Sequence, residues 1–116
     1  VAGAGGDAVA EVAPRPGDAV VLKPRYSAFD HTPLVVLLRE LAVDRLLLAG
    51  TATEMCVVQT AIDARELGFK VTIVSDACAT VDERMERLAL EYAQEIVGAR
   101  LAQAAEVEPG REAAEL

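Results

Sequence analysis

The sequence is poor in the residue types from which many active sites are built. Its 116 residues include one histidine, two cysteines and no tryptophan, and aromatic residues make up 3%. The two cysteines, Cys56 and Cys78, are too few and too far apart for a disulfide scaffold or for zinc-ligand spacing. His31 is the single imidazole, so a mechanism that pairs a nucleophile with a histidine base has one candidate. We therefore expect reduced thiols, no metal and no cofactor.

Positive charge and long apolar runs are also scarce. The chain has 11 basic and 19 acidic residues, which gives a net charge of −8 at pH 7. A surface of this charge repels phosphates, so we expect no nucleic-acid partner and no anionic membrane partner. No apolar run reaches the roughly 18 residues of a membrane span, and no basic start followed by an apolar stretch suggests export. We expect a cytoplasmic protein.

Composition divides the chain into three parts. Residues 1–17 are small, rich in glycine and proline and without periodicity, which predicts a loose lead-in. Residues 18–104 alternate apolar runs with helical patterns and predict one domain, which is what this length allows. Residues 105–116 are acidic and contain Pro109 and Gly110, so we expect a frayed tail there.

Within the central part, the pattern predicts strands that alternate with helices. The predicted strands are 19–23, 45–50, 70–77 and 96–102, and the predicted helices are 32–43, 53–68 and 81–95. Thr32 and Thr53 are the predicted N-caps of the first two helices, and Gly68 is the predicted end of the second. Apolar residues recur at helical spacing in the third helix, at Met85, Leu88, Ala89 and Tyr92.

The predicted strands are continuous apolar runs, which is typical of a parallel sheet with helices on both faces. The predicted fold class is therefore α/β, a three-layer α/β/α sandwich. Ligands of such sheets bind at the carboxyl ends of the strands. Residues 23–32, 50–56 and 75–82 follow those ends and form the predicted site.

Cys56 is the first candidate for chemistry at this edge. If Thr53 caps the helix, the thiol lies in the first turn, where free amides and the helix dipole favour a thiolate. The same amides can stabilise an oxyanion. The alternative is that Cys56 is inert packing, as free cysteines usually are. We interpret Cys78, which lacks a clear helix cap, as filler.

Lys23 is the second candidate, because it ends an apolar run at the same edge and precedes Pro24. An ammonium near the sulfur favours the thiolate and can orient a carbonyl substrate. Taken alone, Lys23 is interpreted as a surface lysine whose charged end extends into the solvent at a strand end. Tyr26 and Phe29 either wall a pocket or cover the sheet end. His31 reads as a solvated side chain.

Three segments of the sequence together resemble one known family. They are "VVLKPRYSAFDHTPLVVLLREL", "LLLAGTATEMCVVQTAIDARELGFKVTIVSDACAT" and the helix that follows, and the likeness covers residues 18 to 102. The specific elements are G-x-x-T-x-x-C-V, then T-A-x-D-A-x-E-L-G, with K-P-x-Y-S-x-F upstream. They resemble the isochorismatase-like cysteine hydrolases, which include nicotinamidases and N-carbamoylsarcosine amidases.

The resemblance implies a three-layer α/β/α fold and hydrolysis of an amide or related bond of a small molecule. It places Cys56 on the nucleophile and Lys23 on the lysine of an Asp-Lys-Cys triad. It implies an oxyanion hole from the backbone amides of Cys56 and Ala52, with a cis peptide between Thr51 and Ala52. Thr51, Tyr26 and Phe29 are the expected substrate-binding residues. The family commonly forms dimers or tetramers, so we also expect a homo-oligomer.

The triad aspartate of the family ends a first strand that this sequence lacks. Asp7 and Asp18 do not follow apolar strands. We therefore expect the carboxy-terminal portion of such a hydrolase, with little or no activity as this chain. The alternatives are a non-catalytic α/β association module or a degenerate fragment. Nucleotide binding is disfavoured, because "GTATEM" has neither a Walker lysine nor a second glycine.

Overall fold

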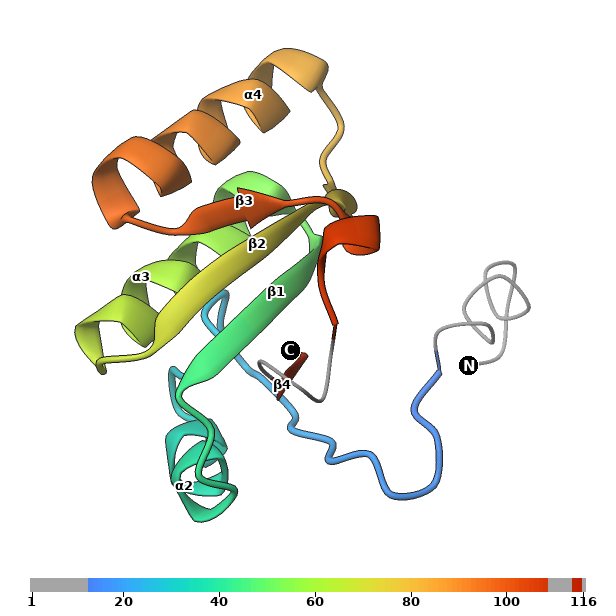
Figure 1. Ribbon diagram of the computed structural model, residues 1–116, viewed down its shortest axis with the longest axis vertical. Coiled ribbons are helices and arrows are strands. Elements are labelled where there is room, and N and C mark those ends of the chain that lie inside the picture. The colour runs from blue at the N-terminus through green and yellow to red at the C-terminus, as the bar shows by residue number, and fades with distance from the viewer. Residues whose placement is uncertain (1–12, 109–113, 116) are drawn as a thin grey trace.

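The computed structural model describes residues 13–108 and 114–115. Three parallel strands form the main sheet, and they are β1 (Arg45–Thr51), β2 (Lys70–Ala79) and β3 (Arg100–Ala102). A short strand, β4 (Ala114–Glu115), pairs with the other side of β1, and the sheet order is β3-β2-β1-β4 (Figure 1). The predicted α/β class with a parallel sheet is confirmed.

Helical segments connect these strands in chain order. They are α2 (Leu34–Glu40) before β1, the π-helical turn η1 (Thr53–Val57) and α3 (Val58–Glu66) between β1 and β2, α4 (Glu83–Tyr92) and the π-helical turn η2 (Ala93–Val97) between β2 and β3, and the 3-10 turn η3 (Ala104–Glu106) after β3. Because β1, β2 and β3 are consecutive neighbours, right-handed crossovers place α3 and α4 on the same face of the sheet.

The hydrophobic core lies between that face and the helices. Leu46 pairs with Val71 and Leu48 with Ile73, so these four side chains share one face of the sheet. They belong to one buried cluster with residues of α2 and α3, including Leu38, which is 2% exposed. Each fully buried aliphatic side chain of this kind contributes about 1.5–3 kcal/mol of transfer free energy. The core therefore fixes β1, β2 and α2 relative to one another.

The opposite face of the sheet carries Leu47 and Val74, which are buried but lie outside the core cluster. The turn η3 reaches this face, since the Ala104 amide donates a hydrogen bond of 2.8 Å to the Asp76 carboxylate. Among the described residues, α2, α3 and α4 form one helical layer on the core face of the sheet. The described α-helices do not form the second helical layer of the predicted sandwich, on the opposite face.

Residues 19–23 do not form the strand that their composition predicts. A strand needs a neighbour for its backbone hydrogen bonds, and a groove separates residues 19–21 from β1. The described part of the chain supplies no strand to fill that space. This prediction was wrong because strand propensity without a pairing partner does not produce a strand.

Two of the predicted helix starts also differ. Thr53 is the first residue of η1 rather than its cap, and it is fully buried with its hydroxyl unpaired among the described residues. The cap position is Ala52, which has no side-chain acceptor. Helix α2 begins at Leu34, so its cap position is Pro33, one residue after the predicted cap Thr32. Thr32 Oγ1 still accepts a hydrogen bond from the Leu34 amide.

The remaining boundaries are close to prediction. Gly68 ends α3 with a φ of +94°, where glycine is favoured, and its amide donates to the Arg65 carbonyl. Residues 96–97 belong to η2, so β3 is shorter than the predicted strand. In the segment expected to fray, residues 114–115 form β4. No helix in the described ranges is long and apolar enough to cross a membrane.

We predict that Asp82→Ala lowers the free energy of unfolding by about 1 kcal/mol. Asp82 caps α4, because its Oδ1 accepts hydrogen bonds from the amides of Arg84 and Met85 at 2.7 and 3.3 Å. Urea unfolding followed by circular dichroism measures the effect. The matched control is Asp82→Asn, which keeps an acceptor oxygen and should stay within a few tenths of a kcal/mol of the unmodified chain. Equal losses in both variants would contradict the capping role.

Candidate functional site

A groove of about 480 Å³ opens beside the carboxyl end of β1. One wall is formed by residues 19–21, a second by α2, and a third by residues 48–51 of β1. Lys23 and Cys56 both line it, so the two sequence candidates for chemistry face the same cavity. Most of the lining side chains are aliphatic.

Lys23 and Cys56 are in direct contact, although 33 positions separate them in the sequence. The Lys23 Nζ atom donates a hydrogen bond to Cys56 Sγ at 3.4 Å. Cys56 is the fourth residue of η1 and is partly exposed. The sulfur therefore lies near the start of a helical segment, beside a cation, with access to the groove.

The ammonium of Lys23 is oriented by backbone carbonyls of its own loop. Its Nζ donates to the carbonyl oxygens of Arg25 at 3.1 Å and Tyr26 at 3.2 Å. A lysine ammonium has three N–H donors, so these two carbonyls and the Cys56 sulfur account for all of them. The tight turn after Lys23 thus aims its charge at the sulfur.

This loop is attached to α3 through a side chain that sequence reasoning missed. Thr60 is 5% exposed, and its Oγ1 accepts a hydrogen bond of 3.0 Å from the Ala28 amide. Thr60 lies one helical turn after Cys56, so the same helix carries the thiol and holds the loop of Lys23. The only sign of this role in the sequence was a threonine between the apolar residues of the predicted helix, at Val58 and Ala61.

The backbone before η1 has an uncommon conformation. The peptide between Thr51 and Ala52 is cis, as the resemblance implies. Gly50 has a φ of +133°, which other residues rarely adopt. The Ala52 carbonyl accepts hydrogen bonds from the amides of Met55 and Val57, which begin the helical segment. The chain therefore turns sharply from β1 into η1 and brings Cys56 to the groove.

Polar contacts on the far side of η1 tie it to the end of β2. Thr80 Oγ1 donates a hydrogen bond of 2.9 Å to Glu54 Oε1.

Across the sheet, Gly50 pairs with Cys78 after a register shift that follows Leu48. Cys78 packs against the core, and its thiol donates to the Val74 carbonyl. Cys78 is a packing residue, in agreement with the sequence interpretation.

The two thiols differ in their surroundings. Burial raises the pKa of the Cys78 thiol, and the nearby carboxylates of Glu86 and Asp76 raise this pKa further, while a backbone hydrogen bond from Gly50 opposes them. A raised pKa leaves less thiolate at neutral pH, so Cys78 is a poor nucleophile there.

The structure places one of the three expected substrate-binding residues at the groove and the other two elsewhere. Thr51 lines the groove, whereas Tyr26 and Phe29 are absent from its described walls. Phe29 stacks on Phe69 with ring centroids 5.9 Å apart, and this contact fits the alternative that it covers the core. Tyr26 is 53% exposed. His31 is also exposed and contacts Asp30 at 2.7 Å, so it is a solvated side chain as expected.

No carboxylate or imidazole belongs to the described lining of the groove. Asp18 closes a local turn, where its Oδ2 accepts a hydrogen bond from the Arg15 amide at 2.8 Å. Asp7 lies outside the described residues. Within the described ranges, no three potential metal ligands of the His, Cys, Asp and Glu types lie together.

The chain resembles known proteins over most of its length. The isochorismatase domain profile matches residues 3–106. An uncharacterized isochorismatase family protein, PncA of Bacillus subtilis, is 38% identical over 81 residues, which are 70% of this chain and 44% of that protein.

Two solved structures extend the likeness to the fold. The nicotinamidase SaPncA from Staphylococcus aureus is 31% identical with a TM-score of 0.74, and the match covers 84% of this chain and 61% of that one. N-carbamoylsarcosine amidase from Thermoplasma acidophilum is 32% identical with a TM-score of 0.76, covering 85% and 56%. The chain therefore spans less than two thirds of each of these three relatives. By its sequence profile and its fold, this chain belongs to the isochorismatase family.

Proposed function

We propose that this chain is the nucleophile-bearing part of a cysteine hydrolase that cleaves an amide or related bond of a small molecule. The observation that carries the proposal is the 3.4 Å contact between Lys23 Nζ and Cys56 Sγ on the wall of the groove. The names of the two structural relatives, a nicotinamidase and an N-carbamoylsarcosine amidase, support an amide substrate. We also propose a cytoplasmic location, because the free thiol that the reaction needs stays reduced there.

In the proposed reaction, the Cys56 sulfur attacks the substrate carbonyl carbon. A carbon–sulfur bond forms, and the carbonyl electron pair moves to oxygen. The positive charge of Lys23 stabilises the attacking thiolate. Backbone amides of Ala52 and Cys56 are the proposed donors to the oxyanion, because the chain turns sharply there into a helical segment. The aliphatic lining and Thr51 favour a small, weakly polar acyl group.

Collapse of the tetrahedral intermediate breaks the bond to the leaving group and leaves the acyl group on Cys56 as a thioester, which water then cleaves to the carboxylic acid and the free thiol. An amine leaves only after it receives a proton. General acid–base groups contribute about 10²- to 10⁴-fold to such steps. The described walls of the groove offer no carboxylate or imidazole for this transfer. We therefore propose that the 116-residue chain alone is acylated by reactive substrates but turns over amides poorly. The same observation favours the second candidate, a non-catalytic association module.

We predict that p-nitrophenyl acetate acetylates Cys56. Nitrophenolate leaves without a proton, so this reaction needs the nucleophile and the oxyanion donors but no general acid. Intact-mass spectrometry should detect one acetyl group, and peptide mapping should place it on Cys56. The adduct should disappear in Cys56→Ala and persist in Cys78→Ala. Nicotinamide hydrolysis, followed as ammonia release, should stay at least about 10²-fold below that of a complete hydrolase.

Rapid nicotinamide turnover by the chain would overturn the proposed impairment and leave the nucleophile assignment intact. Acetylation that is equal in Cys56→Ala and the unmodified chain would overturn the nucleophile assignment and favour the association module.

A separate prediction concerns the alkylation of the two thiols by iodoacetamide. At pH 7, Cys56 should react before Cys78, because the raised pKa of Cys78 leaves it mostly protonated. Raising the pH should increase the rate at Cys78 more strongly. Lys23→Met should slow the alkylation of Cys56, because the ammonium in contact with the sulfur is lost.

The matched control for this alkylation experiment is Lys70→Met. Lys70 is exposed at the amino end of β2, so its loss should leave the Cys56 rate unchanged. Equal slowing by both lysine variants would show that the Lys23 contact has no specific effect on the sulfur.

A further inference from the structure

A second cavity, of about 240 Å³, opens at the amino ends of the parallel strands. We call it the basic pocket, because its lining includes Arg45, Arg65, Lys70 and Arg100. No aspartate or glutamate belongs to the described lining. Four of the 11 basic residues therefore meet at one cavity, in a chain that also carries 19 acidic residues.

The sheet brings three of these cations together. Arg45, Lys70 and Arg100 are the first residues of β1, β2 and β3. The register pairs Arg45 with Lys70, and it pairs Arg100 with Thr72, two residues after Lys70. Because side chains alternate between the two faces along a strand, the three cations project from the same face of the sheet, the one that carries Leu47.

The fourth cation reaches the basic pocket from a helix. Arg65 lies in the last turn of α3, and its Nε donates a hydrogen bond of 3.4 Å to the Val97 carbonyl. Gly98, which also lines the cavity, follows directly. A Cβ atom at Gly98 would lie 3.4 Å from the Arg65 Nη2 atom, so the missing side chain leaves room for the guanidinium at this edge.

The cations of the basic pocket have no counter-ion in the part of the chain that the structure describes. No carboxylate there lies within ion-pair distance of any of the four. Arg45 and Lys70 are direct neighbours on adjacent strands, and like charges in that position destabilise a sheet. A bound anion would offset this repulsion.

The chemistry of the pocket favours phosphate groups. Three of its four cations are arginines, whose planar guanidinium groups bind phosphate oxygens in pairs. The net charge of −8 does not prevent such binding, because salt screens exposed charges that lie more than about 8–10 Å away.

The dimensions of the pocket indicate how many phosphates it holds. The strands β1 and β3 are separated by β2, which places Arg45 and Arg100 on strands about 10 Å apart. Two linked phosphates can contact cations on all three strands, whereas a single phosphate is too small to span them. The cavity is smaller than the roughly 300–1,000 Å³ of sites for drug-sized ligands, so little beyond the phosphates is enclosed.

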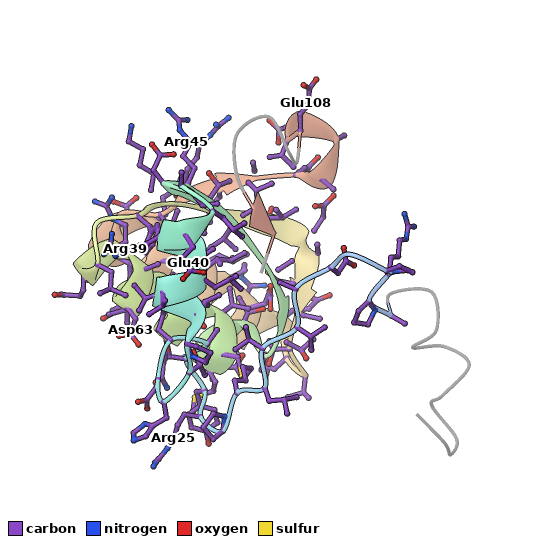
Figure 2. All side chains as sticks on the ribbon, turned by 90° about the horizontal axis from the view of Figure 1, so that it is seen from below. Arg25, Arg39, Glu40, Arg45, Asp63 and Glu108 are labelled. Carbon is purple, nitrogen blue, oxygen red and sulfur yellow. The ribbon has the colours of Figure 1, made fainter. Side chains whose placement is uncertain are left out.

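We propose that the basic pocket binds a diphosphate group, either as inorganic diphosphate or at the end of a small phosphorylated molecule. Figure 2 shows Arg45 and Arg25 at opposite ends of the view, and Arg25 belongs to the loop of Lys23. The pocket is therefore separate from the groove that Cys56 lines. Binding there does not depend on the proposed hydrolysis.

Isothermal titration of the 116-residue chain with sodium diphosphate, without divalent cations, tests the proposal. At about 50 mM salt we expect a dissociation constant of about 10–100 μM, with at least tenfold weaker binding of inorganic phosphate. ADP distinguishes the two sources: binding of both probes assigns the site to the diphosphate group itself, and binding of inorganic diphosphate alone assigns it to the free anion. Failure of both probes to bind, or binding of phosphate as tight as that of diphosphate, would overturn the proposal.

Charge variants locate the bound anion. Arg45→Gln and Arg100→Gln should each weaken diphosphate binding about tenfold, because each removes a charge-assisted hydrogen bond. The matched control is Arg87→Gln, an equal charge change at an exposed residue outside the pocket, which should leave the affinity within about twofold. Circular dichroism and an unchanged alkylation rate of Cys56 should show that the variants stay folded. Equal weakening by all three variants would show that only the overall charge matters and would overturn the site.

Acetylation of lysines gives an independent test, since the chain contains two lysines, Lys23 and Lys70. Lys70 lines the basic pocket and Lys23 lines the groove. Saturating diphosphate should slow the acetylation of Lys70 by sulfosuccinimidyl acetate and leave the rate at Lys23 unchanged, as measured by peptide mass spectrometry. Equal protection of both lysines, or protection of neither, would contradict binding in the pocket.

Discussion

The parallel pairing of β1 with β2 is the constraint from which the rest of the structure follows. It places Leu46 and Leu48 beside Val71 and Ile73, and the helices pack on this apolar surface. It also brings the carboxyl ends of both strands to one edge, where the turn into η1 begins. The position of Cys56 therefore follows from the geometry of the sheet and does not depend on side-chain contacts within the site.

A second element fixes the other half of the candidate site without a sheet. Residues 19–23 have no strand neighbour in the described chain, yet Lys23 still reaches Cys56. The hydrogen bond from the Ala28 amide to Thr60 holds the loop on α3, and α2 follows that loop into the core. The contact between the two residues thus depends on local anchoring and on the packing of α2.

The sequence predicted most of the fold because its signals were local. Apolar runs and glycine ends located β1, β2 and α3, and the family motif located Cys56, Lys23 and the cis peptide. The strand at 19–23 failed because pairing is a non-local property. The cap at Thr53 failed because Thr53 is already the first residue of η1, and the cap position belongs to Ala52, which has no polar side chain. Phe29 could not be assigned from sequence, since its partner Phe69 lies far along the chain.

The geometry around the Lys23 ammonium limits what this residue can do. Its three N–H donors are directed at two loop carbonyls and at the Cys56 sulfur. A bound carbonyl would have to displace one of these acceptors before it could receive a hydrogen bond from Lys23. In the proposed reaction, the substrate oxygen would therefore be bound by the backbone amides around Ala52, so side-chain changes there would alter specificity less than changes in backbone path.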